Sequence, residues 1–300
     1  LGADVVRVER ADGDDMVRSK AADPALAALG LGESFVAQGA GKRSLALDAR
    51  DPRAKQALAS LIAGADVLVE NFRPGKLAAL GFDPADLIVR HPRLVVCSIS
   101  GFGPQSDRRA YDHVVQAASG LMAANADAAG TPRRIGFPVI DYAVGQQAAQ
   151  AVLAALLRRE RQGATRARGE WLQVTMQDAA LTLLAPVYAA PLVSGREVPR
   201  SASTAFSGSP LSGTFEAADG HLALVCNAPD QAAALLRALA EAGSDAALVA
   251  ELAAAAQQPD VTAAQRLLAQ ALRARGVADW DARLAAHGVP ATRVRPAAEA

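Results

Sequence analysis

The sequence predicts an α/β protein with a large domain built on a Rossmann-like parallel sheet and a smaller α+β domain. Short apolar segments alternate with helical segments through the first hundred residues. These segments are continuously apolar, which is typical of strands buried on both faces of a parallel sheet. Strand–helix alternation with short connections indicates a doubly wound sheet. A turn-rich segment then precedes an alanine-rich stretch, which indicates the second domain.

Three strands are expected in the first hundred residues, over 3–8, 66–70 and 94–99. Between them, Asp51 and Asp83 each precede a proline. An aspartate N-cap followed by proline at the first helical position is a strong helix start. We therefore expect one helix over residues 52–63 and another that begins at residue 84.

The segment from residue 111 to 195 is predicted to be mainly helical. Helices are expected over 112–124, 142–161 and 177–193, and a strand is expected over 171–175. The helix over 142–161 is the clearest, because apolar residues four apart fall on one of its faces. These residues are Val144, Ala148, Val152 and Leu156.

Serine, glycine and proline are frequent over residues 196–212, so we expect a linker there. Beyond it, Asp219-Gly220 predicts a hairpin turn. Alanine-rich helices over 229–287, interrupted by Pro259, and an extended piece at Val294 complete the small domain. The predicted division is a large domain over 1–195, a linker over 196–212 and a small domain over 213–300.

Composition limits the classes of partner. The chain has 300 residues, with 31 basic and 31 acidic side chains and no net charge. Neutrality argues against nucleic acid or an anionic membrane as the main partner. No apolar run approaches the roughly 18 residues of a membrane helix. Cys97 and Cys226 lie far apart within apolar runs, which favours buried reduced thiols and a cytoplasmic protein.

Several catalytic and metal-binding motifs are excluded by their spacing. Residues 41–44 (Gly-Lys-Arg-Ser) lack the hydroxyl residue that a phosphate-binding loop needs directly after lysine. No G-x-G-x-x-G segment follows the first strand, and no G-x-S-x-G elbow occurs. The four histidines are scattered without metal-ligand spacing, so no metal is expected.

Polar and aromatic residues follow each expected strand. They are Glu9-Arg10 after the first strand, residues 71–75 (Asn-Phe-Arg-Pro-Gly) after the second and 100–103 after the third. Ligands of open α/β sheets bind beyond the carboxyl ends of the strands. Arginine, amide and aromatic groups there suit a ligand with phosphates and a flat base. The alternative that such loops are simply polar stays open at this point.

These segments resemble the family III CoA transferases, which include formyl-CoA transferase, carnitine CoA-transferase and α-methylacyl-CoA racemase. The matching segments are residues 1–9, 41–48, 65–75, 111–112, 116–122, 176–179 and 288–290. The resemblance covers essentially the whole chain. It implies coenzyme A as co-substrate, acyl-CoA and carboxylic acid substrates, and an interlocked homodimer. It also leads us to expect a fragment that lacks a first strand and helix and a final return to the large domain.

The resemblance assigns roles to positions of this sequence. It places the nucleophilic aspartate at Asp141, just before the helix over 142–161. The implied CoA-binding residues are Arg10, Leu47, Arg50, Asn71, Phe72, Arg109 and Tyr111. A basic residue of the family falls on Ala79, so that contact is missing or is supplied by Lys76. The glycine-rich loop of the family is only partly present, over residues 207–209 (Ser-Gly-Ser).

These assignments predict a CoA transferase that acts through an aspartyl anhydride and an aspartyl-CoA thioester. A carboxylate at a helix N-terminus is favoured as the anion, and backbone N–H groups there can hold an oxyanion. The alternative role for Asp141 is a plain N-cap. The interval from Tyr111 to Asp141 fits the interval in the family and favours the nucleophile.

Two further functions are alternatives. The racemase branch moves a proton beside the thioester and has a histidine directly before the acid at the position of Asp112. Tyr111 occupies that place here, and His113 lies two residues on, which points elsewhere in a helix. A CoA-binding protein without activity is the third hypothesis, and retention of Asp141 argues against it. The acyl donor and acceptor stay open.

Overall fold

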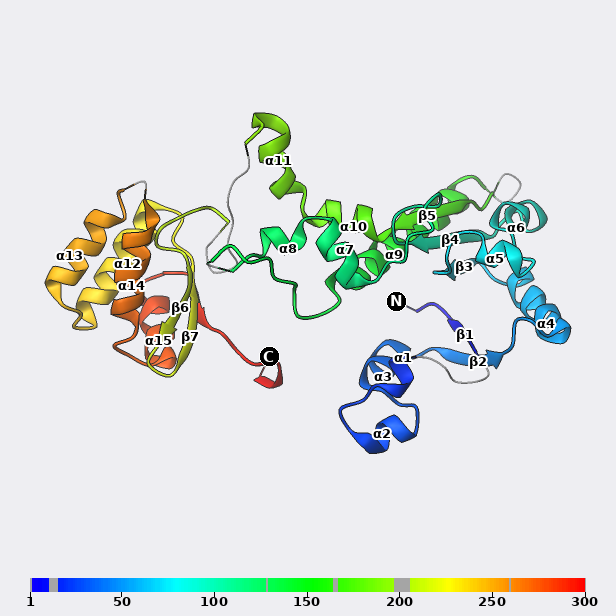
Figure 1. The fold of residues 1–300 in the computed structure, drawn as a ribbon, viewed down its shortest axis with the longest axis horizontal. Helices are drawn as coiled ribbons and strands as arrows, with labels where there is room; N and C mark the ends of the chain where they lie inside the picture. The colour runs from blue at the N-terminus through cyan, green and yellow to red at the C-terminus, as the bar shows by residue number, and fades with distance from the viewer. Residues whose placement is uncertain are drawn as a thin grey trace. The chain divides into compact units, whose positions relative to one another are not determined.

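The structure is a computed structural model that describes residues 2–10, 16–127, 129–163, 167–196, 206–258 and 260–299. The chain forms two compact units (Figure 1). The first unit comprises Leu1–Val115 and Val139–Ala180, and the second comprises Gln116–Pro138 and Leu181–Ala300. The domain boundaries at 195 and 213 stay a prediction, and most of the expected linker, over 197–205, lies outside the described residues, as does Pro259.

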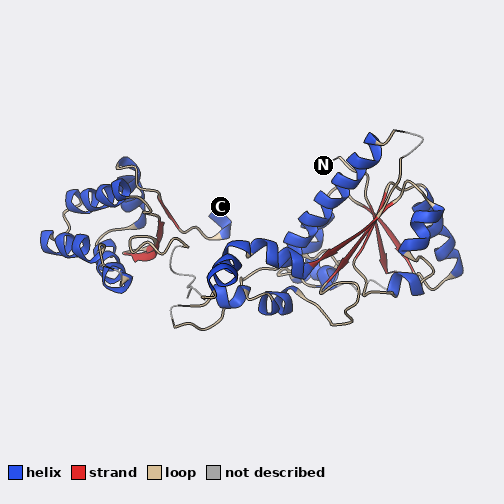
Figure 2. Ribbon diagram, turned by 90° about the horizontal axis from the view of Figure 1, so that it is seen from above, coloured by secondary structure: helices blue, strands red, loops and turns tan. Residues whose placement is uncertain are grey.

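Parallel strands form the sheets of the first unit, which confirms the α/β class. One sheet pairs β1 (Val6–Arg10) with β2 (Arg43–Leu47), and the other has the order β3 (Val67–Glu70), β4 (Val95–Ser100) and β5 (Trp171–Thr175). All pairings are parallel, and the strands fan out with a twist in Figure 2. The sequence did not reveal β2, because its side chains are only partly buried and form no continuous apolar run.

Helices connect and cover these strands. Those within the first unit are α1 (Met16–Ser19), α2 (Pro24–Ala28), α3 (Glu33–Gly39), α4 (Pro52–Ala63), α5 (Lys76–Ala79), α6 (Pro84–Arg90) and α9 (Val139–Arg161). The expected starts are confirmed. The Asp51 carboxylate accepts from the N–H of Arg53, and the Asp83 carboxylate accepts from the N–H of Ala85.

Strand β4 is buried on both faces. Val95, Val96 and Cys97 have no exposed surface. Val96 packs with a cluster from α4, α5 and α6, and alternate side chains of a strand point to opposite faces. Helix α9 contacts β4 and β5. Burial raises the pKa of the Cys97 thiol, which keeps it protonated and unreactive, as a buried reduced thiol should be.

The far end of α9 is fixed by a buried arginine. Arg159 donates one guanidinium N–H to the backbone carbonyl of Arg93 at 2.6 Å and another to Asp66 Oδ1 at 2.8 Å. These two acceptors lie just before β4 and β3. The contacts lock the register of α9 against the sheet, so its N-terminal turn occupies a defined place.

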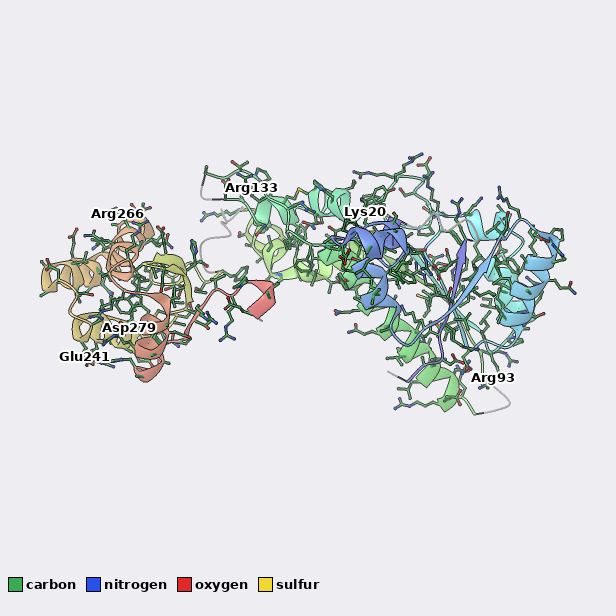
Figure 3. All side chains as sticks on the ribbon, turned by 90° about the horizontal axis from the view of Figure 1, so that it is seen from below. Lys20, Arg93, Arg133, Glu241, Arg266 and Asp279 are labelled. Atoms are coloured by element: carbon green, nitrogen blue, oxygen red, sulfur yellow. The ribbon has the colours of Figure 1, made fainter. Side chains whose placement is uncertain are left out.

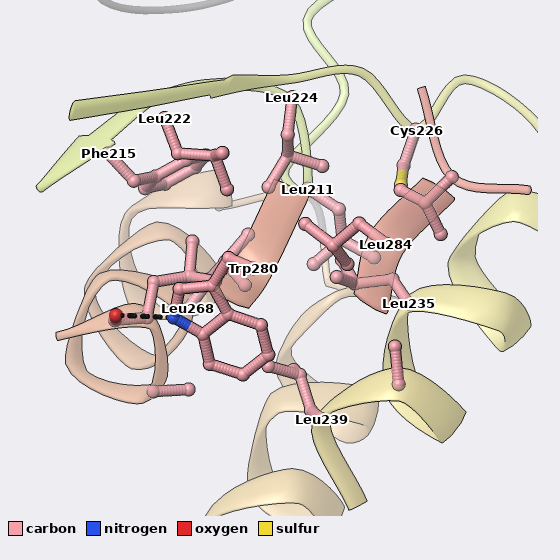
Figure 4. Packing of buried hydrophobic residues seen from close by; sticks show 14 of the residues in the cluster. Leu211, Phe215, Leu222, Leu224, Cys226, Leu235, Leu239, Leu268, Trp280 and Leu284 are labelled. Carbon is pink, nitrogen blue, oxygen red and sulfur yellow. Dashed lines mark hydrogen bonds between the residues drawn. The ribbon is translucent and has the colours of Figure 1, made fainter. Parts of the chain in front are cut away.

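The second unit contains an antiparallel sheet covered by helices. Its strands are β6 (Gly213–Ala217), β7 (Gly220–Leu224) and β8 (Ala291–Arg293), and its helices are α8 (Leu121–Ala124), α11 (Ala185–Ser194), α12 (Pro229–Glu241), α13 (Ala246–Ala255), α14 (Val261–Leu272), α15 (Val277–Ala286) and the 3₁₀ helix η1 (Ala297–Glu299). The hairpin expected at Asp219-Gly220 is present between β6 and β7. Trp280 lies at the centre of the leucine- and alanine-rich core that joins sheet and helices (Figure 4).

Two expected helices are interrupted. The helix predicted over 112–124 divides into α7 (Asp112–Ala118) and α8, because Gly120 has a left-handed φ of 76°. The helix predicted over 177–193 divides at Leu184 into α10 (Met176–Leu183) and α11, where Pro186 cannot donate a helical hydrogen bond. Among the described residues no single helix is long and apolar enough to cross a membrane. The consecutive helices α10 and α11, which are bent by 74° relative to one another, together have the length and composition of a membrane span.

Candidate functional site

Asp141 lies in the first turn of α9, as the third residue of the helix. The helix was expected to begin at Tyr142, so the expected start was three residues late and the N-cap role for Asp141 is wrong. Pro138 directly precedes the helix and has neither a backbone N–H nor a side-chain acceptor. In a capping box a Glu or Gln at this third position accepts from the N–H of the capping residue, and Pro138 has no such N–H to offer Asp141.

The start of α9 is capped from another helix. Asp112 begins α7 and is 7% exposed. Its Oδ2 accepts from the backbone N–H of Ile140 at 2.7 Å and from that of Asp141 at 3.4 Å. The first contact has ordinary hydrogen-bond length and the second is long. The residue that starts α7 therefore fixes the turn that carries Asp141.

The carboxylate of Asp141 accepts no hydrogen bond from the residues that the structure describes, and the residue is solvent-exposed. Its pKa is raised above the usual 3.8, first by partial loss of hydration and second by the negative charge of Asp112. Exposure to solvent screens this effect. The direction is opposite to the one that the helix dipole alone predicts.

Three of the predicted CoA-binding residues come together at the carboxyl end of β1 and β2. Arg10 and Leu47 are direct partners in the parallel register. Arg50 donates to both carboxylate oxygens of Asp48, at 2.9 and 2.8 Å. The pKa of Asp48 is lowered to about 2, mainly by these bonds and in smaller part by the charge of Arg10. The carboxylate of Asp48 thus pairs with Arg50 at the strand end that also carries Arg10.

Glu9 anchors the strand end that carries Arg10. Its carboxylate accepts two hydrogen bonds from Arg18, at 2.7 and 2.8 Å, and one from the Ser44 hydroxyl at 2.6 Å. The Arg18 bonds are the largest cause that lowers the pKa of Glu9 to about 2. The Arg18 guanidinium also stacks over the ring of Phe35, 3.6 Å from its centre. These contacts fasten α1 and α3 to β1 and β2.

Asn71 and Phe72 follow β3 directly. The backbone N–H of Phe72 donates to Glu70 Oε2 at 2.8 Å, and the Phe72 ring is 46% exposed. A pocket of about 140 Å³ opens beside this ring and extends over the ends of β3 and β4. It is lined by residues that include Phe72, Arg73, Pro74, Ser98, Ser100 and Pro104. An exposed aromatic face beside such a pocket suits a flat ligand group.

Arg109 and Tyr111 are exposed in the loop that joins β4 to α7. The loop is held by a close approach between Gly101 and Ala110, where a Cβ added to Gly101 would lie 2.1 Å from the Ala110 Cβ. The Arg108 guanidinium stacks over Phe102 at 4.2 Å. The loop that presents Arg109 therefore has a defined path.

Two side chains at this end of the first unit were missed by sequence reasoning. Gln38 of α3 donates to the hydroxyl of Tyr142, the residue after Asp141, at 3.2 Å. The backbone N–H of Gln177, the second residue of α10, donates to the carbonyl of Gly101, and the buried Oε1 of Gln177 has no partner among the described residues. Gln38 belongs to no motif, and Gln177 lies in the family-matching segment over 176–179 without an assigned role, so only the fold reveals their contacts.

The basic residue expected near Ala79 and the partial serine-glycine loop over 207–209 lie in different units. Ala79 ends α5 and Lys76 begins it, so a basic side chain is present one helical turn earlier. In the second unit, Ser207 donates to Asn227 Oδ1 at 2.7 Å, and Ser209 donates to the carbonyl of Cys226. The partial serine-glycine loop is thus tied to the end of β7. No group of three or more metal-ligating side chains gathers among the described residues.

Comparison with known proteins identifies the family. The chain matches CoA-transferase family III over residues 1–300, and it belongs to that family. It is 34% identical over 204 residues to a succinate–glutarate CoA-transferase of Agrobacterium fabrum, which covers 65% of this chain and 50% of the relative. It is 36% identical over 186 residues to a formyl-CoA:oxalate CoA-transferase of Afipia carboxidovorans, which covers 61% of this chain and 42% of the relative.

A solved structure shows the same fold. A CAIB/BAIF family protein from Brucella suis superimposes with a TM-score of 0.78 at 29% identity, covering 100% of this chain and 78% of that chain. The chain spans about half the length of the curated relatives that it matches.

The Gly101–Ala110 contact gives a prediction for CoA affinity. Gly101→Ala should push the loop away from Ala110 and displace Arg109, which raises the Kd for CoA about 10-fold, or about 1.4 kcal/mol. The double variant Gly101→Ala/Ala110→Gly restores the space and should restore the affinity. Calorimetric titration with CoA measures both. Gly136→Ala is the control, because an added Cβ there meets nothing within 4 Å. Equal affinity of the single and double variants would contradict the prediction.

Proposed function

We propose that this protein transfers coenzyme A from an acyl-CoA thioester to a free carboxylic acid, with Asp141 as the nucleophile. Membership of CoA-transferase family III supports CoA transfer as the reaction class. The observation that carries the assignment is the state of Asp141. Its exposed carboxylate stands at a helix start, accepts no hydrogen bond from the described residues and has a raised pKa. A more basic carboxylate without hydrogen-bond donors is a stronger nucleophile while it stays ionised.

The first half of the reaction forms a thioester on the protein. A carboxylate oxygen of Asp141 attacks the thioester carbonyl carbon, the C–S bond breaks, and CoA leaves as the thiolate. The product is a mixed anhydride between Asp141 and the acyl group. The thiolate then attacks the aspartyl carbonyl carbon of this anhydride. The bond between that carbon and the bridging oxygen breaks, and the oxygen leaves with the acyl group as the carboxylate of the first acid. Asp141 now carries CoA as a thioester.

The second half repeats these steps with the acceptor acid. Its carboxylate attacks the aspartyl thioester and releases the thiolate, which again leaves a mixed anhydride. The thiolate then attacks the acyl carbonyl carbon of the acceptor and frees Asp141 as a carboxylate. No net proton is consumed, so the reaction needs no general acid or base between carboxylate substrates.

The N-terminus of α9 offers limited stabilisation to the tetrahedral oxyanions. The N–H of Ile140 is committed to Asp112, and that of Asp141 is partly so. The N–H of Val139 is the remaining donor of the first turn, because the N–H of Tyr142 faces the carbonyl of Pro138 four residues earlier. Backbone donors of this kind stabilise developing negative charge.

The CoA-binding residues fit the chemistry of the co-substrate. Arg10, Arg50 and Arg109 are cations suited to its phosphates, and the exposed ring of Phe72 is suited to its flat base. In the structure the guanidinium of Arg50 donates to the carboxylate of Asp48, so a phosphate that binds Arg50 must share it with Asp48 or displace Asp48. Asn71, Leu47 and Tyr111 complete the proposed set. An interlocked homodimer, implied by the family resemblance, and a cytoplasmic location, favoured by the two buried thiols, belong to the same proposal.

Intact-mass spectrometry tests the proposal. The protein is incubated with succinyl-CoA or formyl-CoA, chosen because the relatives are named for succinate and for formyl-CoA. We expect a covalent adduct of CoA that hydroxylamine removes, and no adduct with free CoA, which has no activated acyl group. Absence of an adduct, together with solvent deuterium at the α-carbon of a 2-methylacyl-CoA, would overturn the proposal in favour of the racemase.

A further inference from the structure

The first turn of α9 has no cap from its own segment. The three residues before the helix are Gly136, Phe137 and Pro138, and none has a side-chain oxygen. The first four N–H groups of a helix have no partner within the helix and need acceptors from elsewhere. Ile140 is fully buried, so its N–H cannot rely on water.

Asp112 supplies the acceptor from the start of α7. Its Oδ2 accepts a hydrogen bond from the backbone N–H of Ile140 at 2.7 Å and lies 3.4 Å from the backbone nitrogen of Asp141. A charged acceptor forms a stronger hydrogen bond than a neutral one, and it also interacts favourably with the positive end of the helix. The two helices are therefore joined at the residue next to the proposed nucleophile.

We infer that Asp112 is a positioning residue, whose carboxylate fixes the first turn of α9 and thereby the direction in which the Asp141 side chain points. This inference rests on the proposed role of Asp141 as nucleophile. A side chain at the third helical position moves with the backbone of the first turn, because the Cα–Cβ direction is set by that backbone. Misplacing a reacting group by about 1 Å can cost about 100-fold in rate.

The same carboxylate acts on Asp141 through its charge. The charge of Asp112 is the second cause, after partial loss of hydration, that raises the pKa of Asp141. The other titratable neighbours in sequence are Tyr111 and His113 on either side of Asp112 and Tyr142 after Asp141, and all three are exposed. The hydroxyl of Tyr142 accepts from Gln38 of α3, which carries no charge.

Two variants separate the hydrogen bond from the charge. Asp112→Asn keeps an oxygen in the same place, so the turn should hold and kcat should fall less than about 5-fold, while the acid limb of the kcat profile shifts to lower pH. Asp112→Ala removes the acceptor and leaves the buried N–H of Ile140 unpaired. It should lower kcat by about 10- to 100-fold with little change in KM for the acyl-CoA, as losses of supporting residues do. Asp86→Ala is the control, because Asp86 is an exposed acid in the first turn of another helix, α6.

Amide hydrogen exchange by NMR tests the positioning without any need for activity. In Asp112→Ala the amides of Ile140 and Asp141 should exchange at least about 10-fold faster, while those of the α9 interior stay protected. Asp112→Asn should protect both amides nearly as well as the unchanged protein. Unchanged exchange in Asp112→Ala, or equal loss of kcat in both variants, would overturn the inference. A protein that forms no CoA adduct but shows the expected exchange pattern would refute the proposed function and leave the cap itself established.

Discussion

Asp141→Asn is expected to form no covalent CoA adduct and to lose at least about 1,000-fold in kcat. The amide has nearly the shape of the carboxylate, but it has no anionic oxygen to attack a thioester. Asp141→Glu keeps the carboxylate and moves it by one methylene, so a small residual rate and a detectable adduct should remain. Intact-mass spectrometry and steady-state assay with the same acyl-CoA measure the two effects.

The stability of this variant provides the control for folding. The folded-state pKa of Asp141 is raised, so the ionised side chain slightly destabilises the folded state at neutral pH. Asp141→Asn should therefore unfold at the same temperature as the unchanged protein or slightly above it at pH 7. The difference should vanish well below the model-peptide value of about 3.8, where the carboxyl is protonated in both states. A stable variant that still forms the adduct would remove Asp141 from the proposed mechanism.

Trp280→Ala is expected to have the largest effect on stability, about 3–5 kcal/mol. The indole has no exposed surface, and its Nε1 donates to the carbonyl of Leu272 at 2.7 Å (Figure 4). Alanine leaves a cavity between α14, α15 and the antiparallel sheet and removes the donor of that carbonyl. The melting temperature of the second unit should fall by about 10 °C, as measured by circular dichroism.

Two substitutions show whether the loss of stability comes from the buried ring of Trp280 or from its hydrogen bond. Trp280→Phe keeps most of the buried ring and removes the hydrogen bond, so it should cost about 1–2 kcal/mol. Trp171→Ala, on the edge strand β5 of the first unit, removes a ring that is 38% exposed and should have a smaller effect. If Trp280→Ala melts within about 2 °C of the unchanged protein, the ring does not hold this core together.

Local signals were sufficient for most elements. Asp51-Pro52 and Asp83-Pro84 began α4 and α6 as predicted, because an N-cap and a proline act within one turn. The strand over 171–175 was predicted with its observed bounds, and the hairpin at Asp219-Gly220 is present. Figure 3 labels charged side chains of both signs from different parts of the chain, among them Lys20, Arg133 and Asp279. Strand β2 was missed because a partly exposed strand has no continuous apolar pattern.

The sequence by itself determined the α/β class and the parallel strands other than β2, and it proposed the candidate site positions, because periodicity, caps and motif resemblance are written in neighbouring residues. The tertiary structure alone decided that Arg10 of β1 pairs with Leu47 of β2, and that α9 begins at Val139. Its start depends on Asp112, which lies 29 positions before Asp141 and caps the turn from another helix. A contact of that separation leaves no local pattern, since it exists only once the chain has brought the two helices together.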